Sequence, residues 1–246
     1  MAEDFFKKYE KEIMQMVSAS NRLAELGYVA SHGGNLSMRV ADDIILITPT
    51  KVAKRDIECK DICAVDLAGN TIFAPHDRKP TGETPMHTHI YEKRADVRSV
   101  IHSHAPILTG FAIARTDILE YAILPEPVLE LGPVLSIPYK EPLTQALADA
   151  MDEVIDKTNA FLMQNHGVTV MSTDTIERTL DLTEMLEQMA RSVFVASQMG
   201  SVHKIANDEI VNLDRVRSIR NLPMPGKAGE FASLEDVYSN TKEGKK

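Results

Sequence analysis

Ser99-Val100-Ile101-His102-Ser103-His104 is a short segment in which β-branched residues lead into two histidines spaced two apart. Valine and isoleucine favour a strand, and residues two apart on a strand project from the same face of the sheet. The segment therefore predicts a strand whose two imidazoles lie close enough to chelate one metal ion. On its own, the pattern leaves coincidence as an open alternative.

A second pair with the same spacing, His87-Thr88-His89, lies in the segment 83–93, which we expect to be a helix. Residues two apart on a helix point roughly 200° apart, so these two rings would not bind one ion together. Surface or partly buried helix histidines are the simpler interpretation. His87 lies four residues after Glu83 on the same helix face, which makes it a candidate partner of that carboxylate.

A third histidine, His166, follows Gln164-Asn165 and precedes Gly167. It lies at a reversal between two apolar strands expected over 160–163 and 168–171, where glycine lets the backbone turn without a Cβ penalty. Alone, His166 is equally well explained as a turn residue. Together with the strand pair it completes a three-histidine set, which leaves a tetrahedral zinc with one open position, as in catalytic zinc sites.

Glu83 and a glycine pair offer two further polar features. Glu83 follows the turn Lys79-Pro80-Thr81-Gly82 and begins a helix, where a carboxylate is also favoured simply by the helix dipole. The sequence Gly33-Gly34-Asn35 fits a backbone nest for an anion, and it fits an ordinary turn equally well.

The remaining patterns indicate one domain, because no linker and no internal repeat divides the chain. Short strands alternate with helices, often as hairpins, which indicates a largely antiparallel sheet covered by helices. We expect further strands at 44–48, 62–67, 71–73 and 134–137. We expect further helices at 5–27, 109–114 and 143–157, and a long helix from an Asp174 cap to about Met199.

Composition excludes several classes of protein. The 246 residues carry a net charge of −9, which argues against general nucleic-acid binding. Two cysteines, Cys59 and Cys63, exclude a disulfide framework. The acidic N-terminal residues do not resemble a secretory signal, and the sequence contains no run of about 18 apolar residues that would span a membrane. These features predict a cytoplasmic protein.

Taken in order, five segments resemble the class II aldolase/adducin-head family, which includes L-fuculose-1-phosphate aldolase and L-ribulose-5-phosphate 4-epimerase. The segments are Gly34-Asn35-Leu36-Ser37, Ile47-Thr48-Pro49-Thr50, Pro80-Thr81-Gly82-Glu83, Val100-Ile101-His102-Ser103-His104 and Asn165-His166-Gly167. The resemblance covers roughly residues 8–200. It implies a three-layer α/β/α fold of the α/β class with a central, mostly antiparallel sheet. Residues 1–246 would form a single class II aldolase-like domain, assembled as a homotetramer. The polar composition of the C-terminal residues predicts a frayed tail from about 225.

The resemblance also implies roles for individual residues. It makes His102, His104 and His166 the ligands of Zn²⁺, or of another divalent metal such as Mn²⁺ or Co²⁺, and Glu83 the acid/base carboxylate. The substrate phosphate would contact two loops and the glycine turn, which contribute Gly34, Asn35, Thr50, Lys51, Thr81 and Gly82. His87 and Tyr121 are candidates for a supporting role around these groups.

The implied activity is a zinc-dependent aldolase that cleaves a phosphorylated ketose, such as L-fuculose 1-phosphate, to dihydroxyacetone phosphate and an aldehyde. Glu83 favours the aldolases, because epimerase-like members carry aspartate there. A decarboxylase of a phosphorylated 3-keto sugar acid and a sugar-phosphate epimerase are the alternatives on this scaffold. A non-catalytic interaction module of the adducin-head kind is a remote alternative, since adducin heads lack the metal histidines. The expected partner is a small phosphorylated sugar, with no nucleic acid and no membrane.

Three departures from the aldolase pattern leave the substrate open. Lys51 replaces a glycine, and Thr81-Gly82 replaces a serine pair. Lys51 either pairs with a phosphate or carboxylate or points into solvent. The tyrosine that follows the histidine strand in fuculose-phosphate aldolases aligns near Ile123, two residues from Tyr121.

Overall fold

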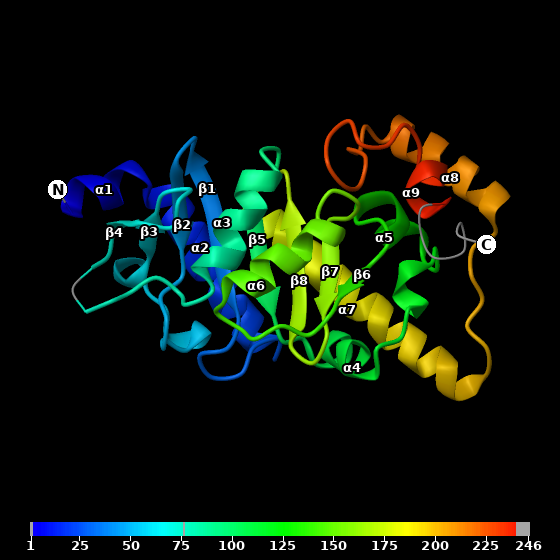
Figure 1. The fold of residues 1–246 in the computed structure, drawn as a ribbon, viewed down its shortest axis with the longest axis horizontal. Coiled ribbons are helices and arrows are strands. Elements are labelled where there is room, and N and C mark those ends of the chain that lie inside the picture. Colours follow the sequence, from blue (N-terminus) through cyan, green and yellow to red (C-terminus); the bar gives the residue numbers. More distant parts are fainter. Residues whose placement is uncertain (1, 76, 240–246) are drawn as a thin grey trace.

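An eight-stranded sheet forms the centre of the computed structural model, which describes residues 2–75 and 77–239 (Figure 1). The strand order is β4-β3-β2-β1-β5-β8-β7-β6. Neighbouring strands are antiparallel, except that β6 and β7 are parallel. The strands are β1 Asn35–Ala41, β2 Ile44–Ile47, β3 Cys63–Val65, β4 Thr71–Phe73, β5 Ser99–Ser103, β6 Leu135–Ile137, β7 Ala160–Met163 and β8 Gly167–Ser172.

Helices cover both faces of this sheet (Figure 1). One face packs against α2, α4 and α7, and the other face packs against α3 and α6. The expected three-layer α/β/α arrangement is therefore confirmed. The helices are α1 Ala2–Lys8, α2 Glu10–Glu25, α3 Thr84–Lys93, α4 Pro106–Ala114, α5 Pro125–Glu130, α6 Gln145–Asp149, α7 Ile176–Met199, α8 Asn207–Ile219 and α9 Leu234–Ser239.

Strand periodicity decides which side chains lie on the α3 face. Ile101 belongs to the core on the α7 side, whereas Val100 belongs to the core on the α3 side. His102 is two residues from Val100 and shares its face. Asn35 of β1 and Thr169 of β8 pair with His102 across the sheet. The sheet therefore sets Asn35 beside His102, directly beneath α3.

The segment 143–157 is not the continuous helix that its apolar spacing predicts. It forms α6, a 3₁₀ helix η4 (Ala150–Glu153) and turns, and Leu143 lies before α6 with a φ of 67°. Leu147 and Met151 nevertheless lie in the core, as expected. The guanidinium of Arg94 takes the carbonyls of Ile155 and Thr158, so these carbonyls are occupied by a side chain at the point where the expected helix would have ended.

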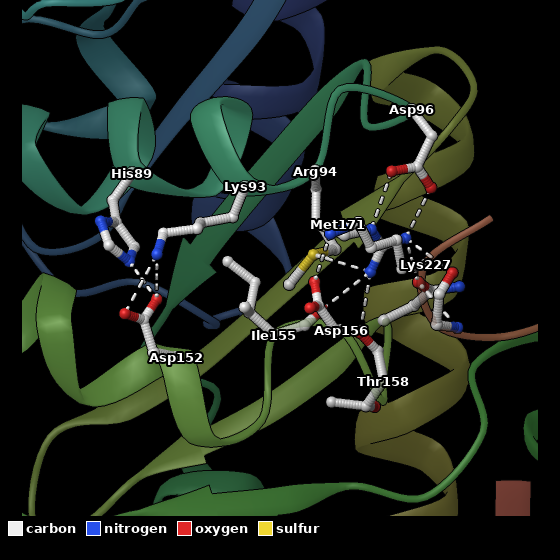
Figure 2. A network of polar contacts seen from close by, with 12 residues as sticks. His89, Lys93, Arg94, Asp96, Asp152, Ile155, Asp156, Thr158, Met171 and Lys227 are labelled. Carbon is white, nitrogen blue, oxygen red and sulfur yellow. Dashed lines mark hydrogen bonds and ion pairs between the residues drawn. The ribbon is translucent and has the colours of Figure 1, made fainter. Parts of the chain in front are cut away.

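Arg94 is the centre of a buried polar network (Figure 2). Besides those two carbonyls, its guanidinium donates to both carboxylate oxygens of Asp96 at 2.8 Å, to Asn159 at 3.1 Å and to the carbonyl of Gly226 at 2.7 Å. The last contact joins the C-terminal segment to the connection between α3 and β5. Buried charges need such full pairing, because an unpaired one is costly to desolvate.

The C-terminal segment is more ordered than its polar composition predicts. Leu234 and Val237 of α9 are buried in a small third core with Ile210 of α8, so the chain from 225 to 239 is not frayed. The expected fraying of residues 240–246 lies outside the described residues.

Two helix boundaries also differ from the expectation. The first helix is divided at Tyr9, and Thr175 rather than Asp174 caps α7 by accepting the backbone N–H of Arg178. In the part of the chain that the structure describes, none of the helices has the length and apolar character to cross a membrane.

Candidate active site

Three histidines converge where β5 ends and where β7 turns into β8. The Nε2 atoms of His102 and His104 lie 3.1 Å apart, and the ring of His166 lies 4.8 Å and 5.4 Å from theirs, centroid to centroid. One ligand atom from each ring falls within 4.8 Å of the other two. A tetrahedral zinc with bonds of about 2.0–2.1 Å holds its nitrogens roughly 3.3 Å apart, so the cluster fits such an ion.

The protonation of these rings also fits a metal. The Nδ1 atom of His102 donates to the carbonyl of Val168 at 3.0 Å, which leaves its Nε2 without a proton and free to bind. Burial lowers the pKa of His102 to about 3 and also lowers the pKa of His104. Both rings are therefore neutral near pH 7, as metal ligands must be.

Gly167 is required at this site for a reason that differs from the expected one. Its φ is not positive, and the left-handed residue of the turn is Asn165, with a φ of 57°. A Cβ on Gly167 would lie 2.5 Å from the carbonyl oxygen of Ser103, 2.8 Å from Cδ2 of His104 and 3.2 Å from Cε1 of His102. The glycine thus lets β8 approach the histidine pair closely.

Glu83, the N-cap of α3, places its carboxylate over the histidine cluster. Its Oε1 lies 3.4 Å from Nε2 of His166, and its Oε2 lies 3.5 Å from Nε2 of His102. Asn35 donates its amide to Oε2 at 2.7 Å, while Oε1 accepts no hydrogen bond in the described part of the chain. Burial opposes ionisation, whereas the hydrogen bond from Asn35 favours the charged form, and the net effect lowers the pKa of Glu83.

The two loops expected to bind phosphate lie side by side. Pro49 and Pro80 form an isolated bridge, the N–H of Thr81 donates to the carbonyl of Thr48 at 3.0 Å, and the N–H of Thr50 donates to Lys79 at 2.9 Å. The hydroxyl of Thr81 accepts the backbone N–H of Glu83 at 3.3 Å. One of the loops is therefore hydrogen-bonded to the start of α3, where the catalytic carboxylate candidate lies.

Comparison with known proteins decides the family. Residues 14–194 match the family described as the class II aldolase and adducin N-terminal domain. The chain belongs to this family. The expected resemblance is thereby confirmed, and the three histidines and Glu83 stand at the segments on which it was based.

Relatives in this family carry more than one activity. The 3-oxo-tetronate 4-phosphate decarboxylase of Haemophilus influenzae is 29% identical over 210 residues, which cover 83% of this chain and 96% of the relative. The L-fuculose phosphate aldolase of Methanocaldococcus jannaschii is 30% identical over 177 residues, or 72% and 92% of the two chains. The crystal structure of YgbL from Klebsiella pneumoniae matches with a TM-score of 0.77 at 26% identity, covering 83% and 98%.

The other site candidates predicted for this member of the class II aldolase family differ in burial and in contacts. Gly34, with a φ of 66°, packs so tightly that a Cβ would lie 2.8 Å from the carbonyl oxygen of His102. The neighbouring Gly33 uses its N–H in a turn to Ala30, so this N–H is not available to a nest. Gly82 is exposed, and so is Lys51, which has a φ of 60°. Tyr121 packs under the ammonium of Lys204, 3.2 Å from its ring centroid.

Lys54 is a residue that the sequence reasoning missed. Its side chain is buried, and its ammonium donates at 3.3 Å to the carbonyls of His32 and Val52, in the glycine turn and the adjoining loop. Burial lowers the pKa of Lys54 to about 8, and the charge of Glu83 partly offsets this effect. In the sequence it reads as one cation of a polar run, so only the fold distinguishes it from the exposed Lys51.

Proposed function

We propose that this chain is a metal-dependent lyase that cleaves a carbon–carbon bond of a small phosphorylated sugar, with the retro-aldol cleavage of a phosphorylated ketose as the first candidate. The products would be dihydroxyacetone phosphate and an aldehyde, as for an L-fuculose 1-phosphate-like substrate. One observation supports this proposal most strongly: the Glu83 carboxylate lies within 3.5 Å of two of three converging histidines.

The arrangement supplies the two groups that retro-aldol cleavage requires. A divalent cation held by His102, His104 and His166 would act as a Lewis acid toward the oxygens of the substrate. Glu83 would remove the proton from the hydroxyl group at the carbon–carbon bond that breaks, because its lowered pKa keeps it ionised near neutral pH. The low exposure of its side chain, 7%, limits competition from water for this proton.

The loops of Thr50 and Thr81 would hold the phosphate away from the reacting carbons. Hydroxyl and backbone N–H groups suit phosphate, and a fixed phosphate orients the rest of the sugar. The hydrogen bond between Thr81 and the N–H of Glu83 links phosphate position to base position. Asn35 already contacts Glu83, so we assign Asn35 two roles: it would hold the substrate phosphate and it would hold the Glu83 carboxylate.

A coupled assay tests the first candidate. The zinc-loaded protein should release dihydroxyacetone phosphate from at least one 1-phosphoketose, and chelation should abolish the release until metal is restored. Absence of the product with every 1-phosphoketose would reject the aldolase.

The second candidate is decarboxylation of a phosphorylated 3-keto sugar acid. The buried ammonium of Lys54 favours it, because its hydrogen-bond partners are neutral carbonyls and the charge of Glu83 offsets its burial only in part, so a substrate with a carboxylate as well as a phosphate would add balancing charge. The decarboxylase of Haemophilus influenzae is also among the similar relatives. Release of carbon dioxide from 3-oxo-tetronate 4-phosphate, lost in Lys54→Met but not in Lys51→Met, would support this activity over the aldolase.

Metal content and assembly are separate parts of the proposal. Zinc is our first choice of ion because three neutral imidazoles are its typical ligands, with Mn²⁺ or Co²⁺ as substitutes. A purified protein that contains and binds none of them would favour an adducin-head-like interaction module. The homotetramer stays a prediction, which sedimentation velocity can check.

A further inference from the structure

A continuous chain of hydrogen bonds runs from Glu83 into the core beneath α3. Asn35 donates to Glu83 at 2.7 Å, and its carbonyl oxygen contacts Nε2 of His87. The Nδ1 atom of His87 lies 2.6 Å from the hydroxyl of Ser37, which lies 2.9 Å from the hydroxyl of Tyr91. We call these four residues behind Glu83 the Glu83 relay.

The carboxylate determines the direction of every hydrogen bond in the relay. An ionised Glu83 only accepts, so the amide nitrogen of Asn35 faces it and the amide oxygen faces His87. That oxygen cannot donate, so Nε2 of His87 carries the proton. A neutral imidazole has one N–H, so Nδ1 is an acceptor and Ser37 donates to it. Tyr91 in turn donates to Ser37.

The surroundings keep this arrangement fixed. Burial lowers the pKa of His87 to about 4 and raises the pKa of Tyr91, so neither changes its charge near neutral pH. The relay residues are at most 5% exposed, which leaves little room for water to replace a partner. Arg39 lies over the Tyr91 ring, 5.0 Å from its centroid, and also contacts its carbonyl. A buried, fully paired chain of this kind strengthens each of its bonds.

We infer that His87, through Asn35, is a positioning residue that holds the Glu83 carboxylate against the metal cluster. The chain does not conduct protons, because the Asn35 amide neither takes up nor releases one near neutral pH. Its role is to fix the rotation of the carboxylate, so that Oε2 is held by Asn35 while Oε1 is left for the reaction. The catalytic part of this inference rests on the proposed lyase function.

Two substitutions of His87 test whether a hydrogen-bond donor at the position of Nε2 is what matters. The amide nitrogen of glutamine reaches about as far as Nε2, and that of asparagine only as far as Nδ1. His87→Gln therefore keeps a donor for Asn35, whereas His87→Asn loses it. The matched control is His89→Gln, on the same helix, where the ring donates to Asp152 instead (Figure 2).

The expected result is an ordered series. His87→Asn should lower kcat and the affinity for Co²⁺, titrated by visible absorbance, by about 10- to 100-fold with KM nearly unchanged. His87→Gln should stay close to the parent protein, and His89→Gln should equal it. Equal losses in the two His87 variants, or an equal loss in His89→Gln, would overturn the inference.

Two further measurements keep the inference testable if a variant fails to fold or the parent shows no turnover. Long-range ¹H–¹⁵N spectra of the unsubstituted protein should show His87 as the Nε2–H tautomer, and an Nδ1–H tautomer would overturn the relay. If no phosphorylated ketose or keto acid reacts, the proposed function fails. The Co²⁺ affinities and the tautomer then decide the relay alone.

Discussion

Two histidine pairs with identical spacing have opposite fates in this protein. At the end of β5, His102 and the following His104 meet, with ring centroids 4.9 Å apart. On α3, His87 contacts Asn35 beside the metal cluster, while His89 reaches away to Asp152 on η4 (Figure 2). The H-x-H spacing therefore predicts whether two rings meet only when the secondary structure that carries it is known. The strand brings the two rings together, as a chelate requires, whereas the helix directs one ring to Asn35 and the other to Asp152.

Removing a strand histidine should have the largest effect. His104→Ala leaves two imidazoles for the ion, so activity should fall by more than the roughly 100-fold that loss of an outer hydrogen-bond partner costs. Zinc per chain, measured by atomic emission after dialysis, should fall with it. A variant that retains one zinc and full turnover would show that the strand pair is not the chelate.

Changing Glu83 should reduce turnover while leaving the three histidine ligands in place. Glu83→Gln keeps the shape and the contact with Asn35 but cannot accept a proton. We expect kcat to fall by roughly 10²- to 10⁴-fold, with a smaller change in KM. Steady-state kinetics on the accepted substrate measure this effect, and an unchanged kcat would remove Glu83 from the proton transfer.

Widening the gap between β5 and β8 should destabilise the fold and disturb the histidine pair. Gly167→Ala forces its Cβ against the Ser103 carbonyl, and we expect the free energy of unfolding to fall by about 1–3 kcal/mol. Co²⁺ affinity should fall as well. Gly110→Ala is the matched control, because its Cβ meets nothing within 4 Å and alanine favours the interior of α4. Equal stability of the two variants in urea titrations would contradict the close approach.

The burial of His87 on α3 should make the free energy of unfolding depend on pH under acidic conditions. When unfolded, His87 has the ordinary pKa of about 6.5, whereas its folded ring stays neutral down to about pH 4. Between these values the unfolded chain binds more protons, so the metal-free protein becomes less stable as the pH falls. His102 acts in the same direction. His87→Gln should remove about 2 kcal/mol of the loss between pH 7 and pH 5, measured by urea unfolding; an unchanged pH dependence would count against this burial effect.

The contact of His89 should matter least. Asp152→Ala removes the acceptor for His89 and for the partly exposed Lys93. We expect the free energy of unfolding to fall by about 1 kcal/mol, because one acceptor is half-exposed and exposed pairs contribute little. Zinc affinity should not change. A weaker zinc site in this variant would show that the two faces of α3 are coupled.

The sequence was most informative where a period or a fixed turn decides geometry. The β-branched run before His102 predicted its strand, and the family resemblance predicted His166 as the third ring, which its place at a reversal alone had left open. The sequence was less informative where contacts with residues far away in the chain determine the local structure. The 143–157 segment forms α6, η4 and turns, which its apolar spacing did not reveal, and Lys54 looked like any surface lysine. The need for glycine at position 167 also depends on its close contact with β5, which is far from it in the sequence.

The Arg94 network has a consequence for where this protein can be divided. Arg94 lies within residues 14–194, whereas the Gly226 carbonyl that it holds lies beyond them. A chain shortened to the matched region would leave a buried guanidinium with one acceptor fewer, which is costly in a low-dielectric interior. We therefore expect the unit that unfolds cooperatively to extend beyond the unit recognised by family similarity. Hydrogen exchange at the Gly226 amide should follow global unfolding rather than local fraying.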